Sequence, residues 1–298
     1  LYCSGRCLTG APADARPPSN VERASLGAAQ DREWIGRVTV PAALQAALAR
    51  PASLTIALSG GIDSLTLSAA AAKVRGTEGV TLCHAVSAAV PSAATARVKD
   101  FAAAWGLPLK LVDAGEFADP SYRANPVNRC YFCKSNLYGT LARMGPLVAA
   151  GTNTDDLSDY RPGLQAAAEH GVLHPFVDAQ MSKADVRALA RALGLGELAE
   201  LPAAPCLASR IETGLRVESV DLAVIDRVET LLRAELGNIT LRCRRLRGGW
   251  VVELDPPLYE GLSAQKRAAI LTQVRRATDD GRAVDLRAYS RGSAFVHQ

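Results

Sequence analysis

The 298-residue sequence lacks the features that mark several classes of protein. It has no run of 18 apolar residues, so no membrane-spanning helix is expected, and its first twenty residues lack the apolar core of a secretion signal. We therefore expect a cytoplasmic protein without a membrane partner. The excess of Lys and Arg, 34 against 30 Asp and Glu, is too small to predict a nucleic-acid partner, but it is compatible with a small anionic one.

Histidine is scarce, and the four histidines are too scattered to predict a metal site or a Ser-His-Asp arrangement. Cysteine is better represented. An odd number of cysteines without a secretion signal favours buried thiols, metal ligands or catalytic thiols over a disulfide framework. The seven cysteines are Cys3, Cys7, Cys83, Cys130, Cys133, Cys206 and Cys243. We interpret Cys83 and Cys243 as packing thiols inside strands, and Cys3 and Cys7 as an incidental pair without further ligands nearby.

Short apolar runs alternate with helical patterns in the first half of the chain. Strands are expected at residues 53–58, 80–86, 108–112 and 146–150, and helices at 65–73, 93–105 and 137–144. An apolar fraction of 48% is sufficient to fill a sizeable core. The alternation predicts an α/β fold with a doubly wound parallel sheet, which has helices on both faces and binds ligands at the carboxyl ends of its strands.

The pattern predicts three parts in the chain. Residues 1–30 have no hydrophobic period and predict a mobile N-terminal arm, residues 31–214 form the larger α/β domain, and residues 215–298 form a smaller α+β domain. Further helices are expected at residues 38–49, 163–170, 182–193 and 220–236, with Ser182 and Ser219 near two N-caps. Strands at 240–246 and 250–254 flank Arg247-Gly248-Gly249, which is typical of a hairpin.

A glycine loop follows the first expected strand and has the sequence Ser59-Gly60-Gly61-Ile62-Asp63-Ser64. Gly60 and Gly61 allow positive φ and close backbone approach, so that N–H groups can point at phosphate oxygens where a helix begins. Ser59 and Ser64 can add hydroxyl donors. The loop does not end in G-K-[ST] and contains no G-x-G-x-x-G, which excludes the Walker A and Rossmann patterns. The alternative is a simple serine-glycine turn.

The loop matches S-G-G-x-D-S, the motif of the PP-loop superfamily, whose adenylating enzymes cleave ATP to AMP and pyrophosphate. This resemblance implies an adenine nucleotide alpha hydrolase-like fold and an ATP pyrophosphatase domain at 31–214. It also implies that Ser59, Gly60, Gly61, Asp63 and Ser64 bind the pyrophosphate part of ATP. Asp63 is then either linked to Mg²⁺ or fixes the loop, and the sequence leaves both roles open.

Three further motifs follow in order, and with the loop they resemble the LarE family of ATP-dependent sulfur transferases over about residues 50–295. They are N-P-V-N-R-C-Y-F-C-K at 125–134, G-T-N-T-D-D-L-S-D-Y-R-P-G at 151–163 and P-C-L-A-S-R-I at 205–211, and the segment D-L-R-A-Y-S-R-G-S at 285–293 is similar to the family's ending. The resemblance implies synthesis of the nickel-pincer nucleotide cofactor of lactate racemase, in which the carboxylates of a pyridinium mononucleotide are adenylated and sulfur replaces the activated oxygen.

Family members supply that sulfur in two ways. In one, a single cysteine at the position of Cys206 gives up its own sulfur; in the other, three cysteines hold a 4Fe-4S cluster that carries an extra sulfide. Cys130, Cys133 and Cys206 match the second type, with Cys206 as the catalytic thiol, and three soft ligands suit a cluster with one open iron. A structural zinc pair and a redox dithiol are the alternatives for Cys130 and Cys133, although no second C-x2-C completes a zinc site.

Charged residues in the matched motifs are candidates for binding the anionic substrate. Asp155 and Asp156 follow the fourth strand and either bind Mg²⁺ or substrate, or cap the next helix. The arginines either pair with phosphate or are solvated surface residues. The candidates are Arg161, Arg210, Arg242 and Arg291, with Arg244 beside Arg242 on one strand face. We also expect a homo-oligomer that receives sulfide or another sulfur donor.

Three other functions compete with sulfur insertion into a small nucleotide. A tRNA thiolase uses the same adenylation, but it requires a broad basic surface or an RNA-binding module that a net charge of +4 does not suggest. An ammonia-using amidating synthetase would not need the cysteines. A nucleotide-sensing or cluster-carrying regulatory protein would release no pyrophosphate with any acceptor.

Overall fold

The computed structural model describes residues 39–145, 147–158, 161–202, 204–237, 239–290 and 292–294. The chain divides into a unit of residues 1–38 and a unit of residues 39–298, and the described residues belong to the second. The predicted arm with Cys3 and Cys7 lies outside the described residues, as does Arg291. The predicted domain boundary between residues 214 and 215 stays a prediction.

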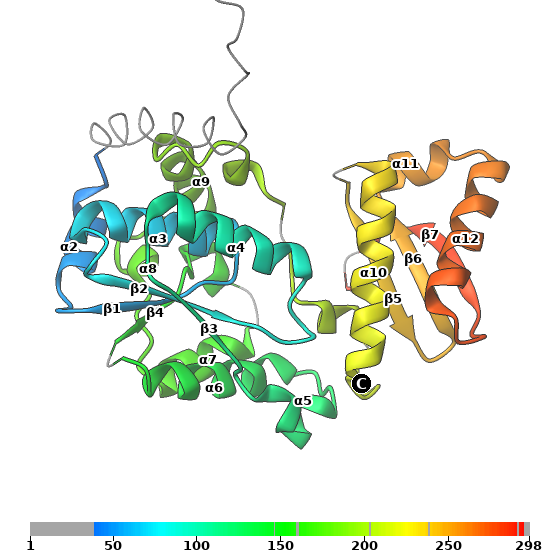
Figure 1. Ribbon diagram of the computed structural model, residues 1–298, viewed down its shortest axis with the longest axis horizontal. Coiled ribbons are helices and arrows are strands. Elements are labelled where there is room, and N and C mark those ends of the chain that lie inside the picture. The colour runs from blue at the N-terminus through cyan, green and yellow to red at the C-terminus, as the bar shows by residue number, and fades with distance from the viewer. Residues whose placement is uncertain are drawn as a thin grey trace, which may run out of the picture. The chain divides into compact units, whose positions relative to one another are not determined.

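A four-stranded, all-parallel sheet forms the first half of the fold and confirms the predicted α/β class (Figure 1). The strand order is β3-β2-β1-β4, with bounds Leu54–Ala57 for β1, Val80–Ala85 for β2, Leu109–Val112 for β3 and Val148–Ala149 for β4. Along the chain, β2 is added beside β1 and β3 beside β2, and β4 is then added on the opposite side of β1. The direction of winding therefore reverses between β1 and β4, where doubly wound sheets bind their ligands.

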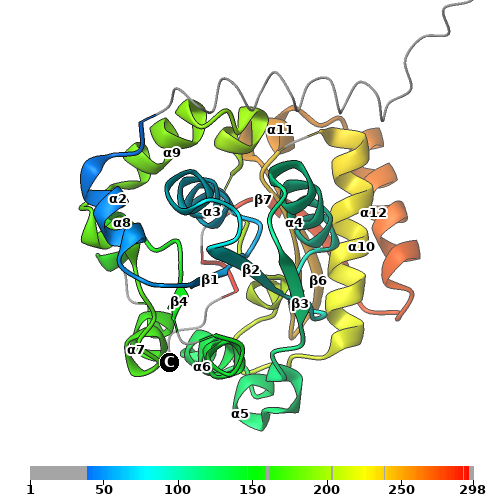
Figure 2. The same cartoon turned by 60° about the vertical axis from the view of Figure 1, so that its left-hand side comes forward.

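Helices cover both faces of this sheet, because its central strands are apolar on both sides. Figures 1 and 2 show α3 and α4 on one face and α6 and α7 on the other. The helices of this half are α2 (Ala42–Ala49), α3 (Ile62–Arg75), α4 (Ser92–Trp105), α5 (Pro120–Arg123), α6 (Arg129–Ala142), α7 (Pro162–Glu169), α8 (Pro175–Asp178) and α9 (Lys183–Ala192). Short 3-10 turns are η1 (Glu116–Ala118), η2 (Thr154–Leu157), η3 (Gly196–Glu200) and η4 (Leu207–Arg210).

One expected helix start is wrong. The helix predicted from residue 137 begins at Arg129, so it includes both cysteines of the C-x2-C pair. Its first turns are rich in Cys, Tyr and Phe, whose intrinsic helix propensity is low, and packing in the fold overrides that propensity. The helix predicted at residues 220–236 is confirmed as α10, and Ser219 lies next to its N-cap, Glu218.

A second, three-stranded sheet follows, in the order β5-β6-β7. β5 (Leu241–Leu246) and β6 (Gly249–Leu254) form the predicted antiparallel hairpin, and β7 (Val284–Ala288) is parallel to β6. The helices of this region are α10 (Ser219–Leu236), α11 (Pro256–Gly261) and α12 (Ala264–Thr278). α11, α12 and β7 were not predicted; α11 and α12 supply the crossover that a parallel pair of strands requires.

The core of this second sheet includes side chains from both sides of residue 214. Tyr122 of α5 and Leu207 of η4 share one buried cluster with Ile225 of α10 and Trp250 of β6. Cys133 and Cys206 pack against the same cluster. The segment around Cys206 is therefore held by the residues that cover the second sheet.

Candidate functional site

The glycine loop lies between the end of β1 and the start of α3, as predicted. Gly60 has a φ of +79°, and a Cβ atom at this position would lie 2.9 Å from the carbonyl oxygen of Ala94 in α4. Within the loop, the Ser59 N–H donates to Ser64 Oγ at 3.2 Å, and the Gly61 N–H donates to Ser59 Oγ at 3.3 Å. The loop is thus pre-shaped by its own serines and seated on α4 at a helix N-terminus, which is suited to an anion.

Two residues outside the motif support the loop from β2 and α4. His84 Nδ1 lies 2.7 Å from the carbonyl oxygen of Leu58, and its Nε2 lies 3.0 Å from Thr95 Oγ1. Burial lowers the pKa of His84, which favours the neutral ring. Arg97 donates to the carbonyl oxygen of Gly60 at 2.9 Å. Neither residue belongs to a motif of the sequence, although the position of His84 at the end of an apolar strand indicates a buried, paired histidine.

Asp63 lies in the first turn of α3 and forms an ion pair that the sequence did not predict. Lys183, at the start of α9, donates to Asp63 Oδ1 at 2.6 Å and to Oδ2 at 2.5 Å. The buried Asn153 side chain also donates to Oδ1, at 3.3 Å. Gly151 packs close to the same turn, since a Cβ there would lie 2.8 Å from the carbonyl carbon of Asp63. The reversal point of the sheet is therefore where the glycine loop and the 151–163 motif meet.

The structure places Asp155 and Asp156 in η2, directly after β4. The Asp156 carboxylate accepts from the Asn153 N–H at 3.1 Å and pairs with Arg161 at 2.8 Å. The Asp155 N–H donates to the Asn153 side chain at 3.1 Å. Asn153 and Asp156 thus form a capping box at the start of η2, which gives the Asp156 carboxylate a structural role. Binding of Mg²⁺ or substrate by these carboxylates stays a prediction.

The three candidate thiols come from two segments. Cys130 and Cys133 lie in the first turns of α6, and Cys206 is the N-cap of η4. Burial and then the neighbouring Cys206 raise the pKa of Cys133 to about 12. The protein atoms packed around Cys130 and the nearby Cys206 also raise the pKa of Cys130, although its side chain still reaches solvent. Cys206 therefore lies within electrostatic reach of both other thiols. Cys130 is exposed, whereas Cys133 and Cys206 are half-buried.

No group of three His, Cys, Asp or Glu side chains among the described residues is arranged to hold a single metal ion. A 4Fe-4S cubane is larger than one ion, so its thiolate ligands are spaced more widely around it. The three thiols are donors of the soft kind that such a cluster takes, and the charges of Arg129 and Lys134 oppose the rise in the pKa of Cys130. Binding of a cluster by these residues stays a prediction.

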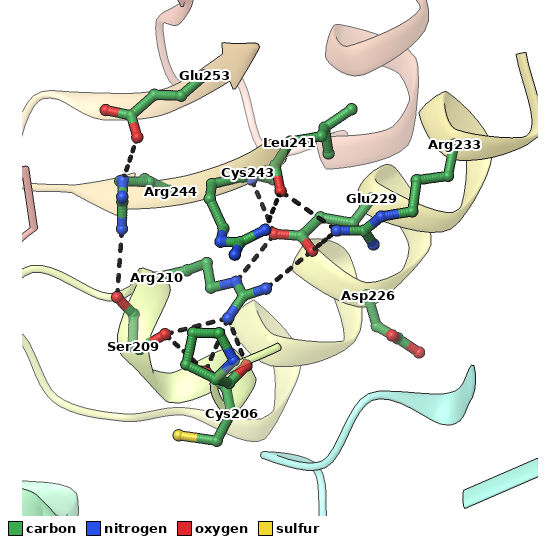
Figure 3. A network of polar contacts seen from close by, with 12 residues as sticks. Cys206, Ser209, Arg210, Asp226, Glu229, Arg233, Leu241, Cys243, Arg244 and Glu253 are labelled. Carbon is green, nitrogen blue, oxygen red and sulfur yellow. Dashed lines mark hydrogen bonds and ion pairs between the residues drawn. The ribbon is translucent and has the colours of Figure 1, made fainter. Parts of the chain in front are cut away.

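Arg210 connects the Cys206 segment to α10 (Figure 3). Its guanidinium donates to both carboxylate oxygens of Glu229, at 2.9 and 3.1 Å, and to the carbonyl oxygens of Pro205 at 2.6 Å and Cys206 at 3.1 Å. Arg210 and Glu229 are 2% and 1% exposed. Burial alone would raise the pKa of Glu229, but the charges of Arg210 and Arg233 lower it overall. Arg210 thus positions Cys206 in this structure, and its predicted substrate contact stays a prediction.

The other arginine candidates lie in or after the second sheet. Arg242 donates to the carbonyl oxygen of Leu241 at 2.7 Å and lies over the ring of Tyr289, 5.9 Å from its centroid. Arg244 is buried, donates to Glu253 at 2.6 Å and reaches the carbonyl oxygen of Ser209 at 3.3 Å. A contact of either residue with substrate phosphate stays a prediction.

Comparisons with known proteins point to one family. No protein-family model matches the chain, and no helix of its described part is long and apolar enough to cross a membrane. An uncharacterised protein of Synechocystis is 40% identical over 209 residues, 67% of this chain and 76% of its own length. An uncharacterised protein of Methanocaldococcus jannaschii is 30% identical over 218 residues, 69% and 79% of the two chains.

A third relative has a named activity. The pyridinium-3,5-bisthiocarboxylic acid mononucleotide synthase of Lactiplantibacillus plantarum is 32% identical over 211 residues, which are 69% of this chain and 76% of the synthase. The chain therefore belongs to the protein family that contains this synthase, in agreement with the LarE resemblance of its motifs.

Proposed function

We propose that the chain is an ATP-dependent sulfurtransferase that converts the carboxylates of a pyridinium dicarboxylate mononucleotide into thiocarboxylates. The observation that supports this most is that Cys133 and Cys206 pack against one buried cluster, with Cys130 one helical turn from Cys133, in a chain related to a bisthiocarboxylic acid synthase. The acceptor is a small anion and the sulfur source is sulfide or another sulfur donor. The homo-oligomer expected from the sequence stays a prediction.

The glycine loop suits the activation step. A carboxylate oxygen attacks the α-phosphate of ATP, pyrophosphate leaves, and an acyl-adenylate forms. Ser59, Gly60, Gly61 and Ser64 would hold the pyrophosphate by backbone N–H groups and hydroxyls. Asp63, now paired with Lys183, would bind Mg²⁺ or fix the loop. Sulfur then attacks the carbonyl carbon, and AMP leaves with the original carboxylate oxygen, because AMP is a far better leaving group than oxide.

The three thiols suit the transfer step. Cys130, Cys133 and Cys206 would hold the 4Fe-4S cluster. When bound, a cluster held by three cysteines supplies one iron without a protein ligand, at which an extra sulfide can be carried. Arg210 keeps the backbone of Cys206 fixed relative to α10, and Arg129 and Lys134 add positive charge beside the thiols.

In the decisive experiment, anaerobic protein is incubated with ATP, the pyridinium dicarboxylate mononucleotide and sulfide. The mass of the acceptor is then measured by mass spectrometry. We expect the mass change of one or two sulfur-for-oxygen exchanges, with AMP and pyrophosphate as co-products. An unchanged acceptor would contradict the proposal. Anaerobically reconstituted protein should also be brown and contain the iron of one cluster per chain, and colourless, iron-free protein would argue against the cluster.

Replacing Gly60 with alanine tests the glycine loop. A side chain at φ +79° is strained by about 1–2 kcal/mol, and its Cβ would collide with the Ala94 carbonyl oxygen, so the loop must move. We expect ATP affinity, measured by calorimetry, to fall about tenfold or more. Gly76→Ala is the matched control, because Gly76 also has positive φ but has no atom within 4 Å of an added Cβ. Equal ATP binding by both variants would count against the loop as the phosphate site.

A further inference from the structure

Lys183 places a positive charge beside the glycine loop. It is the first residue of α9, a helix that packs against α3 (Figures 1 and 2). Its Nζ atom donates to Asp63 Oδ1 at 2.6 Å and to Oδ2 at 2.5 Å, in the first turn of α3. The N–H groups of a helix's first turn have no carbonyl partner within the helix, so they are the donors that a bound anion meets. The ammonium group therefore lies at the same helix end as the proposed phosphate site.

The backbone of Lys183 is held independently of this ion pair. Its N–H donates to Asp155 Oδ2 at 3.4 Å, and a capping box closes the start of α9. The turn before the helix is fixed by Thr154, whose N–H and hydroxyl both donate to the carbonyl oxygen of Met181, at 3.0 and 3.1 Å. Loss of the side-chain ion pair should therefore leave the start of α9 in place.

The charge of Asp63 explains why a phosphate site here needs a cation. A carboxylate in the first turn of α3 is favoured by the helix dipole, but it would repel phosphate oxygens that bind to the same turn. Lys183 offsets that negative charge. An ammonium group has three hydrogen-bond donors, and the two bonds to Asp63 leave one donor for a phosphate oxygen.

The ion pair between Lys183 and Asp63 is accessible to a ligand. The two side chains are 33% and 29% exposed, whereas those of the Arg210–Glu229 pair are each 2% exposed. An ion pair that water reaches contributes little to stability, so this pair is poorly suited to anchor α9 on α3. The alternative is nevertheless a purely structural ion pair between the two helices. The two interpretations make different predictions for the removal of the Asp63 charge.

We propose that Lys183 binds a phosphate oxygen in the pyrophosphate part of ATP, and that Asp63 holds the ammonium group in place before ATP arrives. This inference rests on the proposed function, because it takes the glycine loop as the phosphate site, and it adds a binding residue from outside the loop. In the adenylation step, a bond forms between the carboxylate oxygen and the α-phosphorus while the bond to the β-phosphate oxygen breaks. Lys183 stabilises the negative charge that develops on the leaving pyrophosphate.

Calorimetric binding of inorganic pyrophosphate to the full-length protein, without magnesium, tests this assignment. We expect Lys183→Met to weaken binding about tenfold or more, because a hydrogen bond to a charged ligand is lost. Asp63→Asn should leave the affinity unchanged or raise it, since this variant removes a negative charge beside the ligand. A structural ion pair predicts similar losses in both variants, because each breaks the same pair. Similar losses, or an unchanged affinity in Lys183→Met, would overturn the inference.

Lys266→Met is the matched control. Lys266 also lies in the first turn of a helix with a serine N-cap, and it pairs with Glu235 on the surface. The control removes the same charge from the chain but should leave the affinity for pyrophosphate unchanged. Without ligand, Lys183→Met should melt within about 4 °C of the wild type. A larger loss would identify the Lys183 ion pair as an anchor of the fold and would count against the inference.

Product analysis separates this inference from the proposed function. If the wild type makes thiocarboxylate and Lys183→Met binds pyrophosphate as tightly as the wild type, the role of Lys183 alone is contradicted. If pyrophosphate binding depends on Lys183 but the wild type makes no thiocarboxylate from ATP, acceptor and sulfide, the sulfur transfer is contradicted and the phosphate contact is supported. A wild type that binds neither ATP nor pyrophosphate would overturn both.

Discussion

Replacing Glu229 with alanine is expected to lower the free energy of unfolding by about 3–5 kcal/mol. Glu229 accepts from Arg210 at 2.9 Å, from Arg233 at 2.9 Å and from the N–H of Cys243 at 3.0 Å, and it is 1% exposed. The substitution would leave the Arg210 guanidinium buried without its counter-charge. Denaturant unfolding measures the loss as a lower midpoint at an unchanged slope.

Glu235→Ala on the same helix is the control. Its ion pair with Lys266 is exposed, so the free energy of unfolding should change by no more than about 1 kcal/mol. The double variant Arg210→Met/Glu229→Leu should recover much of the loss, because it removes both buried charges. A similar effect of Glu229→Ala and Glu235→Ala would show that the buried pair does not anchor the Cys206 segment.

Replacing Cys206 with alanine is expected to reduce thiocarboxylate formation by about 1,000-fold or more, since in the proposed function this residue supplies either its own sulfur or a cluster ligand. Pyrophosphate release with the acceptor should continue, because the glycine loop lies in a different segment. Mass spectrometry of the acceptor and a pyrophosphate assay measure the two steps separately. Counting products per chain also separates the two sulfur sources: a sacrificial thiol stops after one exchange, whereas a cluster continues while sulfide is present.

Cys83→Ala is the matched control for thiol removal. Cys83 lies in β2, is 1% exposed, and its pKa is raised by burial, as expected for a packing thiol. This variant should keep both activities and lose only stability, by the removal of a small buried group. Sulfur transfer that survives in Cys206→Ala would contradict the proposed role of the Cys206 thiol. Loss of sulfur transfer in Cys83→Ala would show that removing a thiol acts through the fold.

The sequence predicted the parallel sheet because apolar β-branched strands alternate with helical segments, a signal that is local and periodic. The glycine loop was predicted for the same reason, since its serines and glycines bond within a few residues of one another. Lys183 could not be found in this way. It meets Asp63 from a position 120 residues further along the chain, and only the strand order brings α9 to the start of α3.

Glu229 could be predicted from the sequence in part. The buried residues of α10 follow a helical spacing and include Leu222, Ile225, Val228 and Leu232. Glu229 falls on that buried face, and a carboxylate there requires a paired cation. The pattern could therefore have indicated a buried ion pair, but not that the partner would be Arg210 from the Cys206 segment.

Tyr122 and Leu207 pack in the same core as the second sheet, so the C-terminal third of the chain forms part of the surroundings of Cys206. A fragment ending at residue 214 would retain the strand, loop and helix that surround Asp63. Its Cys206 and η4 would lose the apolar residues of the second sheet that pack against them and Glu229, the counter-ion of Arg210. A different C-terminal module joined to the half that carries the glycine loop would therefore have to supply the same apolar contacts and a counter-ion for Arg210.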